Sequence, residues 1–133
     1  MISSLRPFTA LIAFSAVTLS ALAAGSDWPQ WRGSDRTDVS KETGLLKSWP
    51  ADGPKRLWLF ENAGQGYSGP AIAKGNYYTI GTRDGSEILV VLNANTGKEL
   101  WTAKLGSILD NGWGGGPRGT PTVDGDWVYA LSG

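Results

Sequence analysis

The chain has 133 residues and no formal net charge, because 12 Lys and Arg balance 12 Asp and Glu. Without an excess of basic side chains it offers no positive field for nucleic acid or anionic lipid, which argues against a nucleic-acid partner. The sequence contains neither Cys nor His, so thiol chemistry, the usual zinc sites and any His-based catalytic triad are excluded.

The first residues have the features of a secretory signal peptide. Arg6 precedes a mostly apolar stretch at 8–22, and Ala21-Leu22-Ala23 forms a small-residue cleavage site. A transmembrane anchor needs about 20 continuous apolar residues, and hydroxyl residues interrupt a shorter run here, namely Ser15, Thr18 and Ser20. We therefore predict a signal peptide at 1–23, cleaved after Ala23 or Ala24, and a periplasmic or secreted protein that is not embedded in a membrane after cleavage.

The rest of the chain shows strands and turns, with no convincing helical period. Short apolar-rich runs occur at 56–60, 70–73, 76–81 and 87–92, and another begins at Glu99. Asp84-Gly85 is a strong hairpin signal, and Asn95-Thr96-Gly97 provides a second reversal, closed by a glycine that accepts positive φ. The fold class is therefore predicted to be all-β.

The strand pattern then repeats. Residues 70–80 align without a gap to 121–131, so that Ile72 matches Val123 and Tyr78 matches Tyr129, each 51 residues apart. Trp58 and Trp101 are 43 residues apart, which leaves eight extra residues in the stretch 105–119. A period of about 40 to 50 residues built from four strands is typical of a β-propeller blade.

We accordingly predict a leader at 24–55 that packs on the propeller, followed by about one and a half to two four-stranded antiparallel blades at 56–133. Trp58 and Trp101 are expected at one structural position in successive blades, each indole lying between neighbouring sheets. Thr96 and Gly97 are assigned with them to the structural docking of the blades. Because a ring needs about 4 to 8 blades, the chain is expected to be the N-terminal fragment of a longer propeller.

One phrase carries a family resemblance. Residues 92–101, LNANTGKELW, resemble the blade ending of the pyrroloquinoline-quinone-type (PQQ-like) repeat, with Asn93 where that family usually has Asp. Residues 27–58 are similar to the opening of exported proteins with these repeats. The resemblance implies either a quinoprotein dehydrogenase with PQQ and Ca²⁺ on the central axis, or a non-enzymatic scaffold similar to the periplasmic propeller of the outer-membrane barrel-assembly machinery.

The glycine-rich stretch 112–119 is the candidate ligand or partner site. Trp113 could stack on a ligand, and Arg118 could donate to a carboxylate or an acidic partner. Asp110 and Asn111 offer oxygens for a hard cation, but two ligands fall short of the six to eight that Ca²⁺ prefers. The alternative is a loop that is merely longer. Its G-x-G-x-x-G match is rejected as a dinucleotide site, because a strand and not a helix follows.

The remaining aromatic residues are assigned to packing. The leader tryptophans, Trp28, Trp31 and Trp49, are expected to pack against the propeller body, with a sugar-binding platform near Arg32 and Arg36 as the alternative. Four aromatic residues alternate within the strands and are expected in the core or between blades: Tyr77, Tyr78, Trp127 and Tyr129. Asp84 and Glu61 are lone carboxylates, so no glycosidase pair is indicated.

The leading functional hypothesis is a non-catalytic, cofactor-free propeller module that contacts a protein partner through loops such as 105–119. The alternative is the N-terminal piece of a PQQ-dependent alcohol or sugar dehydrogenase, although no Ca²⁺ ligand set or basic residue for a quinone is identifiable. A carbohydrate-binding propeller is the third hypothesis.

Overall fold

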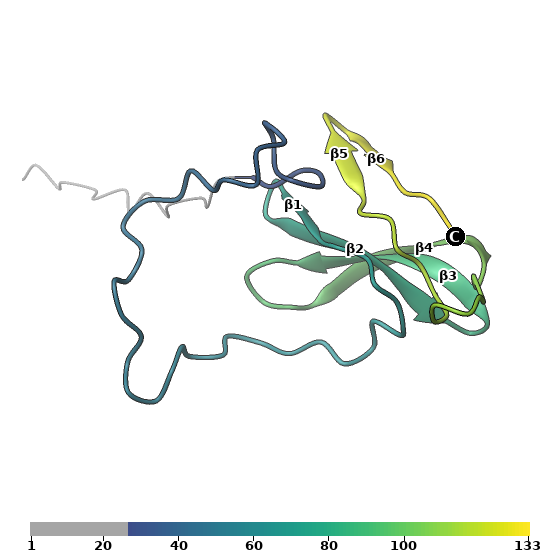
Figure 1. Ribbon diagram of the computed structural model, residues 1–133, viewed down its shortest axis with the longest axis horizontal. Helices are drawn as coiled ribbons and strands as arrows, with labels where there is room; N and C mark the ends of the chain where they lie inside the picture. The colour runs from purple at the N-terminus through teal and green to yellow at the C-terminus, as the bar shows by residue number, and fades with distance from the viewer. Residues whose placement is uncertain (1–26) are drawn as a thin grey trace, which may run out of the picture.

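A computed structural model describes residues 27–133, and the protein is all-β over that range (Figure 1). A four-stranded antiparallel sheet has the order β1-β2-β3-β4, and a two-stranded sheet pairs β5 with β6. The strands are β1 (Ala71–Ala73), β2 (Asn76–Arg83), β3 (Ser86–Asn93), β4 (Glu99–Ser107), β5 (Thr122–Asp124) and β6 (Trp127–Tyr129). The predicted fold class is confirmed at this level, and the described part of the chain contains no helix.

The turns have the conformations that their sequences favour. Asp84 and Gly85 join β2 to β3 with φ values of 49° and 71°, the pair of positive φ angles that a two-residue type I′ hairpin requires. In the turn between β3 and β4, the side-chain oxygen of Asn93 accepts hydrogen bonds from the backbone N–H groups of Asn95 and Thr96 at 3.1 and 3.0 Å. Asn93 therefore closes this turn as an Asx turn.

The 51-residue repeat seen in the sequence is also a repeat in strand register. Ala71 lies opposite Tyr78 in the first hairpin, and Thr122 lies opposite Tyr129 in the second. The β5–β6 hairpin therefore reproduces β1–β2 residue for residue, and we call β1 to β4 the first unit and β5–β6 the second.

Both faces of the large sheet are covered. One face, which we call face A, contains Leu89 and Val91 and packs against Val123 and Val128 of the second unit. The opposite face, face B, contains Ile88, Val90 and Leu92 and is covered from the other side by Trp58 and Phe60. The large sheet is thus the middle layer, with the second hairpin packed on face A and the segment that precedes β1 packed on face B.

The run 56–60 is not a strand, contrary to the sequence prediction. Its side chains alternate as a strand's would, since Leu57 and Leu59 are exposed whereas Trp58 and Phe60 are half-buried. Its backbone, however, is not paired with either sheet. An extended segment counts as a strand only when a neighbour shares its hydrogen bonds, and residues 27–133 provide no neighbour here. Regular structure therefore begins at Ala71.

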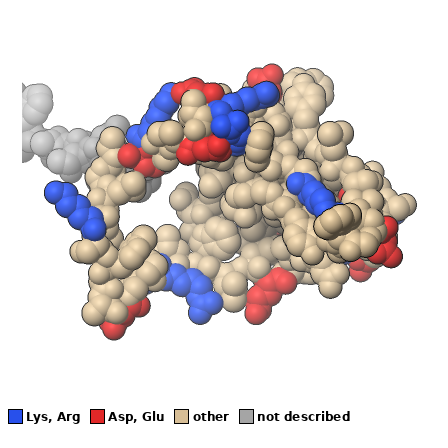
Figure 2. All heavy atoms as spheres, in the orientation of Figure 1, with Lys and Arg blue, Asp and Glu red and all other residues tan. Residues whose placement is uncertain are grey.

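The leader touches the body at its beginning and then forms an arch. Trp28 is half-buried and bridged to Ile72, but residues 34–57 are exposed apart from Gly53. Figure 2 shows open space between this arch and the body. Trp31 and Trp49 are 65% and 69% exposed, so the packing expected of these two residues is not seen.

The predicted signal peptide lies outside the described residues. Within residues 27–133, nothing forms a helix of the length and apolar character needed to cross a membrane.

Candidate functional site: the glycine-rich loop

The loop between β4 and β5 is held firmly at its base. The backbone N–H of Gly116 donates to the carbonyl oxygen of Leu109 at 2.7 Å, which closes the loop on itself. The N–H of Tyr67, from the segment before β1, donates to the carbonyl of Pro117 at 2.7 Å. Pro117 and Pro121 are fully buried. The loop therefore has a fixed shape although its outer part is exposed.

Two glycines permit this shape. Gly114 has a φ of 104°, and a Cβ at that position would lie 2.5 Å from the hydroxyl oxygen of Tyr67. Gly116 has a φ of 96°, and a Cβ there would lie 3.1 Å from the carbonyl oxygen of Gln65. Both positions need a conformation and a close approach that only glycine accepts. The glycines thus bring the loop against the segment 64–67, with a shallow depression of about 410 Å³ between them.

Arg118 is engaged within its own loop. Its guanidinium donates to the carbonyl oxygens of Gly116 and Gly114 at 3.0 and 2.7 Å, and to the side-chain oxygen of Asn111 at 3.4 Å. It also lies over the ring of Tyr67, 5.2 Å from the ring centroid, in a cation–π arrangement. Arg118 therefore ties the loop together, whereas the sequence suggested a donor to an external carboxylate.

Trp113 is the most exposed large hydrophobic residue in the part of the chain that the structure describes. Its backbone N–H donates to the Asn111 side-chain oxygen at 3.0 Å, which fixes the turn, while its side chain is 86% exposed. Asp110 is also exposed. Among residues 27–133, no three His, Cys, Asp or Glu side chains lie close enough together to hold a metal ion.

Beneath the loop lies a buried carboxylate that the sequence analysis did not select. Glu87 on β3 has no exposed surface, and it accepts hydrogen bonds from the backbone N–H groups of Leu109 and Gly133 at 2.9 and 2.8 Å. Burial raises its pKa, but these two bonds, the Ser132 hydroxyl and the charge of Arg118 outweigh burial, so the pKa lies below its ordinary value. Glu87 therefore anchors the loop as a carboxylate.

One sequence signal could have revealed Glu87. Strict alternation along β3 places it on the same face as Leu89 and Val91, which are core residues of face A. A carboxylate at such a position needs hydrogen-bond partners from another segment.

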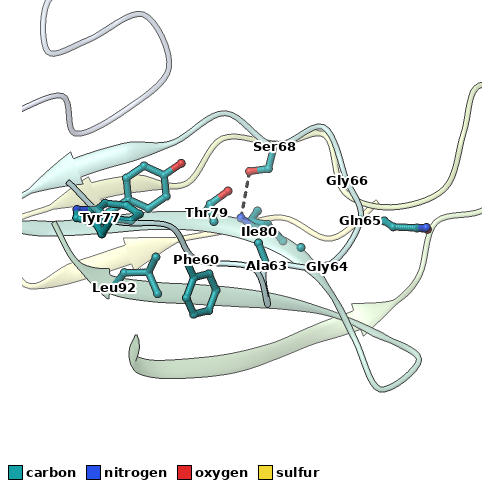
Figure 3. A pocket seen from close by; sticks show the side chains of 12 residues that line it. Phe60, Ala63, Gly64, Gln65, Gly66, Ser68, Tyr77, Thr79, Ile80 and Leu92 are labelled. Carbon is teal, nitrogen blue, oxygen red and sulfur yellow. Dashed lines mark hydrogen bonds between the residues drawn. The ribbon is translucent and has the colours of Figure 1, made fainter. Parts of the chain in front are cut away.

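The second feature of interest lies on face B, where Trp58 packs against Tyr77 and Gly97. We call this contact the aromatic seat; the cavity beside it is drawn in Figure 3. Trp58 donates from Nε1 to the carbonyl of Ala94 at 2.9 Å and meets Tyr77 edge to face, with ring centroids 6.1 Å apart. Gly97 lies directly against the indole, because a Cβ there would be 2.6 Å from Cδ2 of Trp58. Burial raises the pKa of the Tyr77 phenol. A cavity of about 240 Å³ continues from this seat between the sheet and the segment 58–68.

Trp101 occupies the other side of the same sheet. It lies opposite Val91 on β4, and directly opposed residues share a face, so its side chain belongs to face A and is 45% exposed. The structure thus brings Trp58 and Gly97 together and separates Trp101 from both. The Thr96 hydroxyl donates to the Asn93 side chain within the turn, at 3.1 Å.

These features define the class of protein only broadly: an all-β chain of repeated antiparallel hairpins with a rigid, tryptophan-bearing loop between the units. Comparison with protein-family models, with curated proteins and with solved structures gives no match.

Proposed function

We propose that the chain forms blades of an exported β-propeller that acts as a non-catalytic scaffold and contacts a protein partner through the glycine-rich loop. The proposal has two parts, the propeller arrangement and the use of the loop. Each is supported by separate contacts.

The propeller arrangement is supported by contacts between equivalent positions of the two units. The Ser68 hydroxyl donates to the carbonyl of Gly119 at 2.6 Å, and the Lys74 ammonium donates to the carbonyl of Gly125 at 2.8 Å; both pairs are 51 residues apart. Equivalent residues meet in this way where repeated units are stacked by one constant operation, as they are near the axis of a propeller. The resemblance of residues 92–101 to the PQQ-like repeat agrees with this arrangement.

Use of the loop as a contact surface is supported chiefly by the exposure of Trp113 on a fixed support. The indole of Trp113 is 86% exposed. A partner that covers it would remove its apolar surface from water, which favours binding. Trp, Tyr and Arg are the residue types that dominate the binding energy of protein interfaces. Tyr67, which lies against Gly114 and Arg118 of this loop, is 64% exposed. Because hydrogen bonds already hold the loop, little conformational entropy remains to be lost on binding.

Site-specific photo-crosslinking in the cells that export the protein tests this proposal. A photoreactive amino acid replaces Trp113 in the full chain and, as the control, replaces Trp127, which is 72% exposed on the second hairpin. We expect one discrete protein adduct from position 113 and none from position 127. With the partner purified, Trp113→Ala should weaken binding about tenfold or more.

Two results would contradict the proposal. Equal adducts at both positions would show that the loop has no special role. Tight binding of PQQ with Ca²⁺, accompanied by oxidation of an alcohol, would instead favour the dehydrogenase hypothesis.

A further inference from the structure

The first described residues pair with the free edge of β1 through one isolated antiparallel bridge. The backbone N–H of Trp28 donates to the carbonyl of Ile72 at 2.7 Å, and the N–H of Ile72 donates back to the carbonyl of Trp28 at 2.8 Å. Two reciprocal bonds make a hydrogen-bonded antiparallel pair. We call residues 27–33 the strap.

The next strap residue reaches the second unit. The N–H of Val123 on β5 donates to the carbonyl oxygen of Pro29 at 2.8 Å. Ile72 and Val123 are equivalent positions of the two repeats, and their strands belong to different sheets. Two adjacent strap residues, Trp28 and Pro29, therefore accept hydrogen bonds from the equivalent edge residues of the two units, Ile72 and Val123. Proline suits the second contact, because only its carbonyl is needed and its ring restricts the backbone.

Further contacts fix the strap at both ends. A carboxylate oxygen of Asp27 accepts a hydrogen bond from the backbone N–H of Lys74 at 3.2 Å. At the other end, Gly33 donates to the carbonyl of Gln30 at 3.0 Å, and its α-carbon is so close to the Trp28 ring that a Cβ would lie 2.9 Å from Cζ3. The half-buried Trp28 is thereby held between the sheet edge and its own turn.

We propose that the free edges of β1 and β5 form a two-part surface that accepts an extended Trp-Pro peptide, and that the strap is its resident occupant. The strap covers edges that would otherwise present unpaired backbone groups. It also fastens the two units to each other, because β1 and β5 do not pair directly. Any other extended peptide reaches this surface only by displacing the strap. The inference does not depend on the proposed function, because it concerns a different surface.

Engineered disulfides test whether the strap occupies this surface. The chain has no Cys, so a pair of introduced cysteines has no competitor. Cα atoms of a hydrogen-bonded antiparallel pair lie about 5.5 Å apart, within the range that a disulfide spans. We expect Trp28→Cys with Ile72→Cys to oxidise spontaneously in the full chain, and the control, Trp49→Cys with Ile72→Cys, to remain reduced. Equal oxidation of the two pairs, or oxidation of neither, would overturn the proposal.

Hydrogen exchange tests whether the surface accepts a peptide. Deletion of residues 27–33 should speed exchange of the Ile72 and Val123 amides about tenfold or more, with Val90 and Leu92 unchanged. A synthetic peptide of residues 27–38 should restore protection at both amides together. Recovery at Ile72 alone, or at neither, would refute the two-part surface. If the deletion speeds exchange of all amides equally, it has destabilised the whole fold. The disulfide experiment, which leaves the strap in place, then determines whether the strap occupies this surface.

Discussion

Replacement of Gly97 by alanine tests the contact between the indole of Trp58 and the turn between β3 and β4. Gly97 has a φ of 69°, a left-handed conformation that alanine adopts at a cost of about 1–2 kcal/mol. The added Cβ would also lie 2.6 Å from Trp58 Cδ2 and 2.7 Å from Cε3, closer than carbon atoms can approach. The substitution must therefore displace the indole.

Displacement has a separable energetic cost. Trp58 would lose its hydrogen bond to Ala94, whose net contribution is about 0.5–1.5 kcal/mol. It would also lose the edge-to-face contact with Tyr77, for which about 0.5–1.5 kcal/mol is typical. We therefore expect Gly97→Ala to lower the free energy of unfolding by about 2–5 kcal/mol in total.

Gly85→Ala is the matched control. Gly85 has a φ of 71°, and nothing lies within 4 Å of the position that its Cβ would occupy. This substitution should cost only the backbone term of about 1–2 kcal/mol. Urea denaturation of the full chain, followed by circular dichroism, gives both values. The excess for Gly97→Ala measures the contribution of the indole contact.

A double-mutant cycle provides the decisive comparison. In a Trp58→Ala background the obstacle is gone, so Gly97→Ala should cost no more than Gly85→Ala. Equal costs for the two glycine substitutions in the unmodified chain would refute the reasoning, as would an undiminished cost of Gly97→Ala when Trp58 is absent.

Three further predictions concern the loop, its anchor and the two repeat tryptophans. Glu87→Gln should lower the free energy of unfolding by about 1–3 kcal/mol, because one backbone N–H then faces an amide donor, whereas exposed Glu61→Gln should change it by less than about 0.5 kcal/mol; equal effects in urea denaturation would refute the anchor. Because the folded pKa of Glu87 lies below its unfolded value, its contribution is present above about pH 4.3 and is lost as the pH falls through the folded pKa; an acid titration of stability should show this loss in the wild-type protein and a smaller loss in the Gln variant. Arg118→Ala should speed proteolysis within residues 108–119, because the carbonyl oxygens of Gly114 and Gly116 and the side-chain oxygen of Asn111 each lose one hydrogen bond, and the exposed Lys98→Ala should not; equal cleavage of the two variants would refute the structural role of Arg118 in the loop. Trp58→Ala should be more destabilising than Trp101→Ala by about 1 kcal/mol or more, and the reverse order in denaturation would contradict the assigned seat.

Predictions from sequence succeeded where neighbours along the chain decide the outcome. Asp84-Gly85 forms a hairpin because its two residues accept positive φ, and Asn93 closes its turn with its own side chain. The alignment of 70–80 with 121–131 gave the register of the second hairpin, because side-chain alternation fixes which residues can face the core.

The candidate site shows the limit of such reasoning. The sequence suggested that Trp113 and Arg118 are both directed to an external ligand. Both are exposed in the structure, but the guanidinium of Arg118 is hydrogen-bonded within its own loop, whereas the indole of Trp113 is not. Arg118 reaches the carbonyls of its own loop because several glycines fold that loop back on itself. A glycine-rich segment has many accessible backbone conformations, so its path cannot be predicted from the sequence alone.

By itself, the sequence determined that the chain is built of antiparallel hairpins with a 51-residue repeat. Alternating apolar residues and turn residues act over a few positions, and they specify strands wherever partners are near. Only the tertiary structure decided that Glu87 is a buried anchor, that the run 56–60 lies extended but unpaired, and that Trp28 and Pro29 span two units. Each of these depends on whether a segment distant in sequence supplies a hydrogen-bond partner, and that is settled only when the sheets pack.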